Sequence, residues 1–160
     1  MSVSGLKDLA GREAIREVIG RYAVGLDSRD FDLVGTCFAP DAEADYSGVK
    51  VLGGATRIVE WLRAAFSPVV SMHVMTSTKI DLAVDEARTL TYAIVHLVDE
   101  HEDDLRVRVR GLHYQDHFVR LATGWAIQSR VHRAILEYHA AAVDPSLAPA
   151  VRDTPTPNGG

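Results

Sequence analysis

Two side chains in this sequence, an aspartate and a histidine, could together remove a proton near neutral pH. Asp27 follows a helical stretch in "GLDSRDFD", and His73 lies in "SMHVMTSTKI", a run that predicts a β-strand facing a core. A carboxylate beside a neutral imidazole fixes one tautomer and leaves the other ring nitrogen free to act as a base. The alternatives are a helix-end carboxylate and a hydrogen-bonded core histidine, and the sequence separation does not decide between them.

Other polar candidates lie on segments that read as strands or helix faces. Arg133 shares a register with Trp125 and Ile127, which predicts that it points inward, where it needs an anionic partner or a pocket. His96 shares a mostly apolar face with its neighbours, so we expect it to be buried. Ordinary packing is the alternative for the tyrosines of the same regions, Tyr22, Tyr46, Tyr92 and Tyr114.

Three arginines alternate with valines in "RVRVRG", residues 106–111. Beyond Gly111 the apolar register is that of Leu112 and Tyr114, so the apolar positions change parity. This change predicts a β-bulge near Gly111. The alternating arginines, Arg106, Arg108 and Arg110, are expected on a solvated strand face or in an interface between subunits.

The composition narrows the class of protein. A chain of 160 residues with 47% hydrophobic residues can bury a core as one domain. Its 17 Lys and Arg against 22 Asp and Glu argue against nucleic acid as a partner. Cys37 is the single cysteine, and no metal-binding or phosphate-binding motif is present, so we expect no metal and a reducing compartment. The absence of a long apolar run predicts a cytoplasmic protein that does not bind membranes.

The helices and strands that must position these residues are predicted from the spacing of apolar residues and from the prolines, glycines and polar turns that end each segment. Apolar residues from Ile15 to Leu26 predict an amphipathic helix, a second helix covers residues 31–38 with Asp30 as its N-cap, and a third covers 53–68. A short strand is expected at 41–48, and long strands at 69–84, 89–100, 105–121 and 125–138. Residues 1–140 then form one domain, followed by a Pro- and Gly-rich tail at 141–160.

Helices followed by long strands indicate an α+β fold, in which three N-terminal helices cover one face of a strongly curved, mostly antiparallel sheet. Such a sheet forms a cone whose concave side is a pocket. We expect its walls to suit an apolar, cyclic small molecule, because they would come from Val69, Met75, Tyr92, Ile94, Trp61 and Phe66.

Four stretches resemble the SnoaL-like branch of the nuclear transport factor 2-like superfamily, and the resemblance covers roughly residues 6–140. The closest motifs are those of the scytalone dehydratase, bile-acid 7-alpha-dehydratase and hexachlorocyclohexane dehydrochlorinase families. The stretches are "IREVIGRYAVGLDSRDFDLVGTCFAPDAEADYSG", "SMHVMTSTKI", "RGLHYQDHFVRLATGWAIQSR" and "VHRAILEYH". The resemblance implies the cone-shaped fold.

The resemblance also implies roles for individual residues. Asp27 and His73 match the catalytic Asp–His dyad of these enzymes, while Tyr22 and Arg133 match a catalytic tyrosine and arginine. Tyr46 matches a substrate-binding tyrosine, and His96 matches a pocket histidine if one gap is allowed. Leu112 and Tyr114 replace a serine and an asparagine, which argues against scytalone as the substrate. The substrate-binding set is then Tyr46, His96, Tyr114, Trp61, Phe66, Met75, Tyr92 and Ile94.

The implied activity is a cofactor-free elimination on a cyclic, mostly apolar molecule such as a steroid-like or aromatic polyketide compound. Isomerisation and cyclisation begin with the same proton abstraction and remain open, as do a non-catalytic binding domain and a subunit of a larger oxygenase. The resemblance further implies a homo-oligomer, with a trimer favoured over a dimer.

Overall fold

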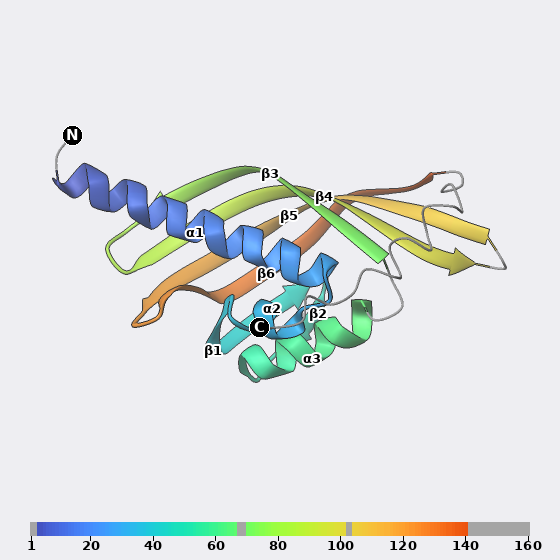
Figure 1. Cartoon of the computed structure of the whole chain (residues 1–160), viewed down its shortest axis with the longest axis horizontal. Helices are drawn as coiled ribbons and strands as arrows, with labels where there is room; N and C mark the ends of the chain where they lie inside the picture. Colours follow the sequence, from blue (N-terminus) through green and yellow to red (C-terminus); the bar gives the residue numbers. More distant parts are fainter. Residues whose placement is uncertain (1–2, 67–69, 102–103, 141–160) are drawn as a thin grey trace, which may run out of the picture.

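The computed structural model describes residues 3–66, 70–101 and 104–140 (Figure 1). Its helices are α1 (Val3–Asp27), α2 (Phe31–Gly35) and α3 (Gly54–Phe66). Its strands are β1 (Phe38–Tyr46), β2 (Val49–Val51), β3 (Val70–Leu82), β4 (Glu86–His101), β5 (Asp104–Leu121) and β6 (Gly124–Ala140). The expected tail, residues 141–160, and Val69 lie outside the described residues.

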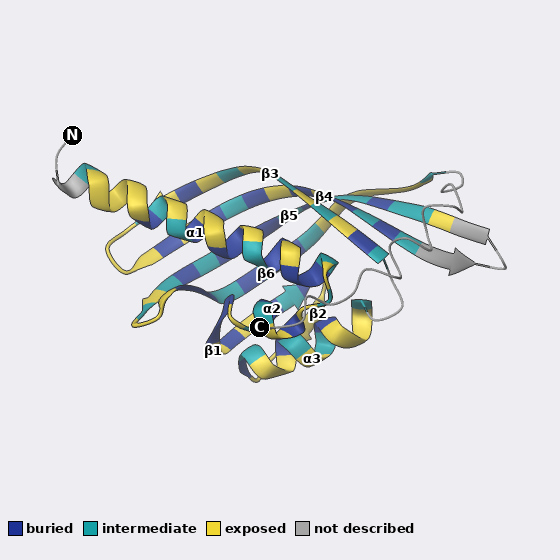
Figure 2. Ribbon diagram, in the orientation of Figure 1, coloured by how far each residue is buried: buried dark blue, intermediate teal, exposed yellow. Residues whose placement is uncertain are grey.

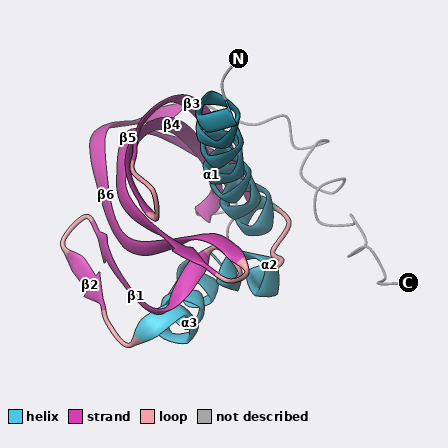
Figure 3. Ribbon diagram, turned by 90° about the vertical axis from the view of Figure 1, so that its left-hand side faces the viewer, coloured by secondary structure: helices cyan, strands magenta, loops and turns pink. Residues whose placement is uncertain are grey.

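The strands form one sheet in the order β2-β1-β6-β5-β4-β3. All neighbouring pairs are antiparallel except β1 with β6, which is parallel. Figure 3 shows the sheet curling strongly, with α1 lying along its open side and α3 beside β1 at one end. The expected α+β cone is therefore confirmed. In the helices that the structure describes, none is long and apolar enough to cross a membrane.

The helices form where local signals predict them. The buried face of α1 carries the expected apolar residues (Figure 2). The Asp30 side chain caps α2 by accepting a hydrogen bond from Leu33 N at 2.8 Å. The second helix is shorter than expected, because β1 already begins at Phe38 and runs through Pro40. The proline is tolerated there because the pairing of β1 with β6 is irregular between Phe38 and Glu43, so the missing N–H breaks no regular ladder.

The register predicted for β4 is wrong. The buried side chains are Thr91, Ala93, Val95 and Leu97, which face the concave side, whereas Tyr92 and Ile94 are 47% and 43% exposed on the outer face. His96 belongs to the same outer row as Tyr92 and Ile94. Both faces of β4 carry large apolar residues, so alternation does not reveal which face is inside.

The register predicted for β6 is also wrong, because of a β-bulge. Ile127 pairs with Phe118 and Ser129 pairs with His117, which leaves Gln128 as an extra residue on β6. The bulge reverses the parity, so that Arg130 and His132 are buried and Arg133 is not. The inward position expected for Arg133 is therefore incorrect.

A register shift does occur beside Gly111, but its extra residue lies on the neighbouring strand. Gly111 pairs with Leu136 and Leu112 pairs with Ala134, so Ile135 on β6 is the bulged residue. Strand β5 keeps a continuous register with β4. As a result Arg108 and Arg110 lie on the same inner face as Leu112, so the solvated strand face expected for these two residues is wrong.

Candidate active site

A cavity of about 340 Å³ opens on the concave side of the sheet, between the sheet, α1 and α3. Most of its wall is apolar or aromatic, and its polar groups include three phenols, a serine hydroxyl, two histidines and two arginines. The lining residues are Tyr22, Tyr46, Ser47, Val49, Trp61, Ala65, Phe66, His73, Val95, Leu97, Arg108, Arg110, Leu112, Tyr114 and His132. This is the composition of a small-molecule site, in which a few polar groups orient an apolar ligand.

Asp27 and His73 are hydrogen-bonded at one wall of this cavity. Asp27, the last residue of α1, accepts hydrogen bonds from His73 Nδ1 at 2.6 Å, from the His73 backbone N–H at 2.7 Å and from Ser71 Oγ at 2.8 Å. With Nδ1–H donating to the carboxylate, Nε2 of the neutral ring carries the free lone pair. The His73 side chain is 1% exposed, and its ring lies 5.7 Å from that of Phe66.

The hydrogen bonds keep Asp27 ionised. Burial alone would raise the pKa of Asp27, but the hydrogen bonds from His73 and Ser71 and the charge interaction with His73 outweigh burial and hold the pKa below its usual value. Arg29, with a left-handed φ of 63°, donates to the carbonyl oxygen of Leu26 at 3.0 Å and to Ser71 Oγ at 3.4 Å. Ser71 and Arg29 thus position the carboxylate, and nothing in their spacing singled them out in the sequence.

Three phenols form the inner end of the cavity. The hydroxyls of Tyr22 and Tyr46 lie 3.3 Å apart, and the ring of Tyr22 packs edge-on against that of Tyr114 at 5.9 Å. Burial raises the pKa of all three phenols, so they are neutral hydrogen-bond donors at neutral pH. Trp61 stacks on Tyr46 with ring centroids 4.6 Å apart, which fixes the orientation of that phenol.

A fully buried ion pair lies beneath the phenols. Arg130 donates two hydrogen bonds to Asp116, from Nε at 2.8 Å and from Nη2 at 2.7 Å, and both side chains have no solvent exposure. The guanidinium lies 4.1 Å from the ring centre of Tyr22 and 4.4 Å from that of Tyr114. These contacts are cation–π interactions in a dry environment. The β6 bulge that turns Arg130 inward has no visible signal in the sequence, so this pair was missed.

His132 is a second buried histidine in the cavity wall that the sequence did not reveal. Its Nδ1 lies 3.0 Å from Ser47 Oγ, and its ring lies between those of Tyr46 and Tyr114. Burial, together with the charges of nearby arginines, lowers the pKa of His132 to about 4. The ring is therefore neutral at neutral pH.

Seven of the predicted site residues meet at the cavity: Asp27 through its bond to His73, and Tyr22, Tyr46, Tyr114, Trp61, Phe66 and His73 in the wall. Met75 is partly buried and packs against the hydrophobic core, but it does not line the cavity. Arg133 instead makes a bidentate ion pair with Asp45 at 2.7 and 2.9 Å and is 42% exposed. The structure thus leaves five predicted residues out of the cavity wall: Met75, Arg133, His96, Tyr92 and Ile94.

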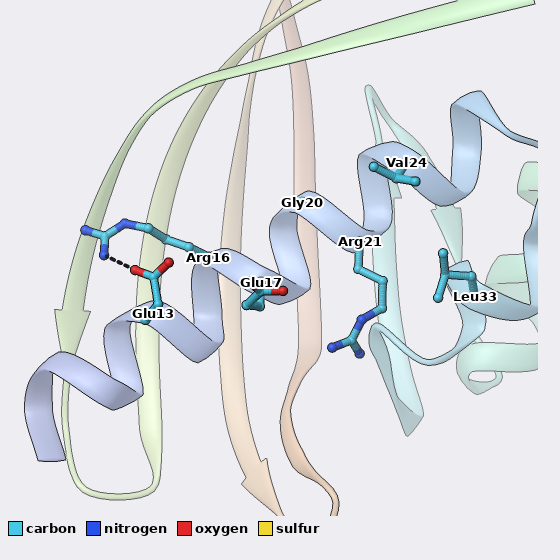
Figure 4. A pocket seen from close by; sticks show the side chains of 7 residues that line it. All are labelled: Glu13, Arg16, Glu17, Gly20, Arg21, Val24 and Leu33. Carbon is cyan, nitrogen blue, oxygen red and sulfur yellow. Dashed lines mark hydrogen bonds and ion pairs between the residues drawn. The ribbon is translucent and has the colours of Figure 1, made fainter.

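A second hollow, of about 400 Å³, lies on the outer side of α1 (Figure 4). It is lined by Glu13, Arg16, Glu17, Gly20, Arg21, Val24 and Leu33. Glu13 and Arg16 form an exposed ion pair at 3.2 Å, and the two acidic and two basic side chains balance in charge. This groove is a solvated helix surface, so we place the functional site in the concave cavity. In the described part of the chain, no cluster of three or more His, Cys, Asp or Glu residues could hold a metal ion.

Comparison with known proteins identifies the family. The model of the SnoaL-like domain matches residues 7–131. An uncharacterized protein of Mycobacterium tuberculosis (strain H37Rv) is 29% identical over 133 residues, which cover 81% of this chain and 89% of that protein.

Solved structures share the fold at low sequence identity. A hexachlorocyclohexane dehydrochlorinase (LinA type 2) superposes with a TM-score of 0.76 at 16% identity, covering 87% of this chain and 95% of that one. A Novosphingobium aromaticivorans protein provisionally named a scytalone dehydratase gives 0.74 at 20% identity, covering 86% and 94%. With the family model matching most of its length, the chain belongs to the SnoaL-like family, as its motifs predicted.

Proposed function

We propose that the protein is a cofactor-independent lyase that removes a proton and a leaving group from a cyclic, mostly apolar small molecule. The observation that carries the proposal is the 2.6 Å hydrogen bond between Asp27 and His73 Nδ1 in the wall of an apolar cavity. A buried imidazole oriented by a carboxylate is the usual arrangement of a general base that works near neutral pH. The dehydrochlorinase and the provisionally named dehydratase that share the fold support elimination as the reaction class.

In the proposed reaction His73 is the general base. Its Nε2 takes a proton from a substrate carbon, and Asp27, which stays ionised, stabilises the imidazolium that forms. The electron pair of the broken C–H bond forms a double bond, and the leaving group departs with its own bonding pair. Neutral phenols in the inner wall, Tyr22, Tyr46 and Tyr114, would donate hydrogen bonds to the substrate atom on which negative charge develops.

The shape of the cavity supports an apolar ring system as the substrate. A volume of about 340 Å³ is at the lower end of the range for drug-sized ligands, and the aromatic rings of Trp61 and Phe66 offer flat surfaces for stacking. Steroid-like and aromatic polyketide compounds fit this description. Isomerisation or cyclisation would use the same first step, so the identity of the product decides among the three reactions.

The test begins with a panel of steroids, bile acids and aromatic polyketides, assayed for turnover by mass spectrometry. With a substrate in hand, His73→Ala should lower kcat by roughly 10³-fold or more, because it removes the base. The matched control is His117→Ala, which removes an outer-face histidine whose partner is Glu86. Turnover by His73→Ala at the rate of the control would refute the assignment, and binding without turnover by the wild type would favour a ligand-binding domain.

Self-association remains a prediction. The outer sheet face exposes a group of large apolar side chains that would suit contact with another copy: Met72, Val74, Tyr92 and Ile94.

A further inference from the structure

His132 is a buried polar residue of the cavity wall to which the proposed elimination assigns no role. It lies on β6, is only 8% exposed and lines the same cavity as His73. Its ring centroid lies 5.8 Å from that of Tyr46 and 5.5 Å from that of Tyr114, so aromatic contacts fix the plane of the ring. A buried imidazole with a fixed ring plane is a suitable hydrogen-bonding group for a ligand.

Ser47 is the hydrogen-bond partner of one ring nitrogen of His132. Ser47 Oγ lies 3.0 Å from His132 Nδ1 and accepts a hydrogen bond from the backbone N–H of Ala134 at 3.4 Å. Because a hydroxyl that accepts from Ala134 still has its own hydrogen to donate, Ser47 can donate to Nδ1. A neutral imidazole that accepts at Nδ1 has its hydrogen on Nε2. With Nδ1 turned to Ser47, Nε2–H is the donor left for a ligand in the cavity.

The backbone around Ser47 holds this arrangement. Ser47 has a φ of 53°, a left-handed conformation that costs a non-glycine residue roughly 1 kcal/mol. The Ser47 backbone N–H donates to the carbonyl oxygen of His132 at 2.9 Å, so the turn between β1 and β2 is tied to the same residue whose ring the hydroxyl contacts. The strained turn thus places the hydroxyl at Nδ1.

The charges around His132 keep the ring neutral. The guanidinium groups of Arg110, Arg130 and Arg133 disfavour a second proton, in addition to burial. On the other sides the ring faces the neutral phenols of Tyr46 and Tyr114. The pKa of about 4 therefore leaves one proton on the ring throughout the neutral range.

We propose that His132 donates a hydrogen bond from Nε2–H to a substrate oxygen, and that Ser47 is the positioning residue that fixes this tautomer. The proposal rests on the proposed function and narrows its substrate class. The substrate carries a carbonyl or hydroxyl oxygen that gains negative charge when His73 removes the proton. The donated proton stays on Nε2, so His132 leaves each turnover unchanged, and a neutral donor of this kind acts like a member of an oxyanion hole.

The first test is spectroscopic and needs no substrate. In protein labelled with 15N-histidine, the ring of His132 should show the neutral Nε2–H tautomer at pH 7, recognised from the different 15N shifts of its two nitrogens. Ser47→Ala should shift the tautomer population toward Nδ1–H while the backbone spectrum stays folded. A His132 ring that is an imidazolium or an Nδ1–H tautomer in the wild type at pH 7 would overturn the proposal.

The second test compares two amides in place of the ring, with the substrate from the panel. His132→Gln places an amide donor near the position of Nε2, whereas His132→Asn can reach Ser47 but offers no group at Nε2. We expect the Gln variant to keep kcat within about 10-fold of the wild type and the Asn variant to lose roughly 10²-fold, the loss typical of one oxyanion donor. Equal kcat in both variants would overturn the proposal.

The two proposals can fail separately. If His73→Ala abolishes turnover and the two His132 variants remain equally active, the base assignment stands and the donor role of His132 is wrong. If His73→Ala stays active while the Asn variant alone loses activity, the elimination mechanism is wrong and the donor role stands.

Discussion

The burial of His132 makes stability depend on pH in a window set by its pKa. The ring has a pKa of about 4 in the folded protein, against the ordinary 6.5 that it regains in the unfolded chain. Between these values the unfolded chain binds a proton that the folded protein does not, so the free energy of unfolding falls as the pH falls. Since one pKa unit corresponds to about 1.4 kcal/mol, the loss is about 2 kcal/mol between pH 7 and pH 5, and about 3 kcal/mol by pH 4.

His132→Gln isolates this contribution, because the amide does not titrate while the other ionisable groups stay in place. Urea unfolding at several pH values, followed by the fluorescence of Trp61 and Trp125, gives the free energy of unfolding of both proteins. The wild type should lose about 2 kcal/mol more than the variant between pH 7 and pH 5. Parallel losses in the two proteins would refute the burial of a neutral imidazole at this position.

Two further predictions concern stability. Arg130→Met leaves the carboxylate of Asp116 buried without its partner and should destabilise the protein by about 3–5 kcal/mol in urea unfolding. The double variant, which adds Asp116→Leu, should recover most of this loss. Equal stability of the single and double variants would contradict this prediction. A Cβ at Gly54, where φ is 86°, would lie 2.2 Å from the carbonyl oxygen of Pro40, so Gly54→Ala should lower the free energy of unfolding by several kcal/mol. Gly124→Ala is the control: φ is 119° there but the space is open, so the loss should be only about 1–2 kcal/mol.

The parts of the fold that the sequence predicted are those in which one face alone is apolar. In α1 the residues from Ile15 to Leu26 form a single stripe, so their burial follows from the helical period. The pairing of Asp27 with His73 was suggested by chemistry and by family resemblance, because no periodicity connects two residues 46 positions apart. The sequence thus predicted which two side chains form the dyad, whereas the distance between them follows only from the fold.

The parts that the sequence did not predict depend on which strand carries a bulge. The extra residue Gln128 is polar and has no unusual backbone requirement, yet it decides whether Arg130 and His132 or Arg133 point inward. Because strand side chains alternate with period two, one inserted residue exchanges the whole inner set for the outer set. The bulge depends on how β6 pairs with its two neighbours, β1 and β5, and the sequence of β6 alone does not specify that pairing.

The buried ion pair that the bulge places at the base of the cavity affects the phenols more than it affects stability. A buried Arg–Asp pair adds little net stability compared with well-packed apolar residues. Arg130, however, lies against the rings of Tyr22 and Tyr114, and its positive charge lowers their pKa against the effect of burial. A phenol beside a cation donates a stronger hydrogen bond than one in an apolar core. The double variant of Arg130 and Asp116 should therefore recover its stability without recovering full activity, which separates the structural contribution of the pair from its effect on the phenols.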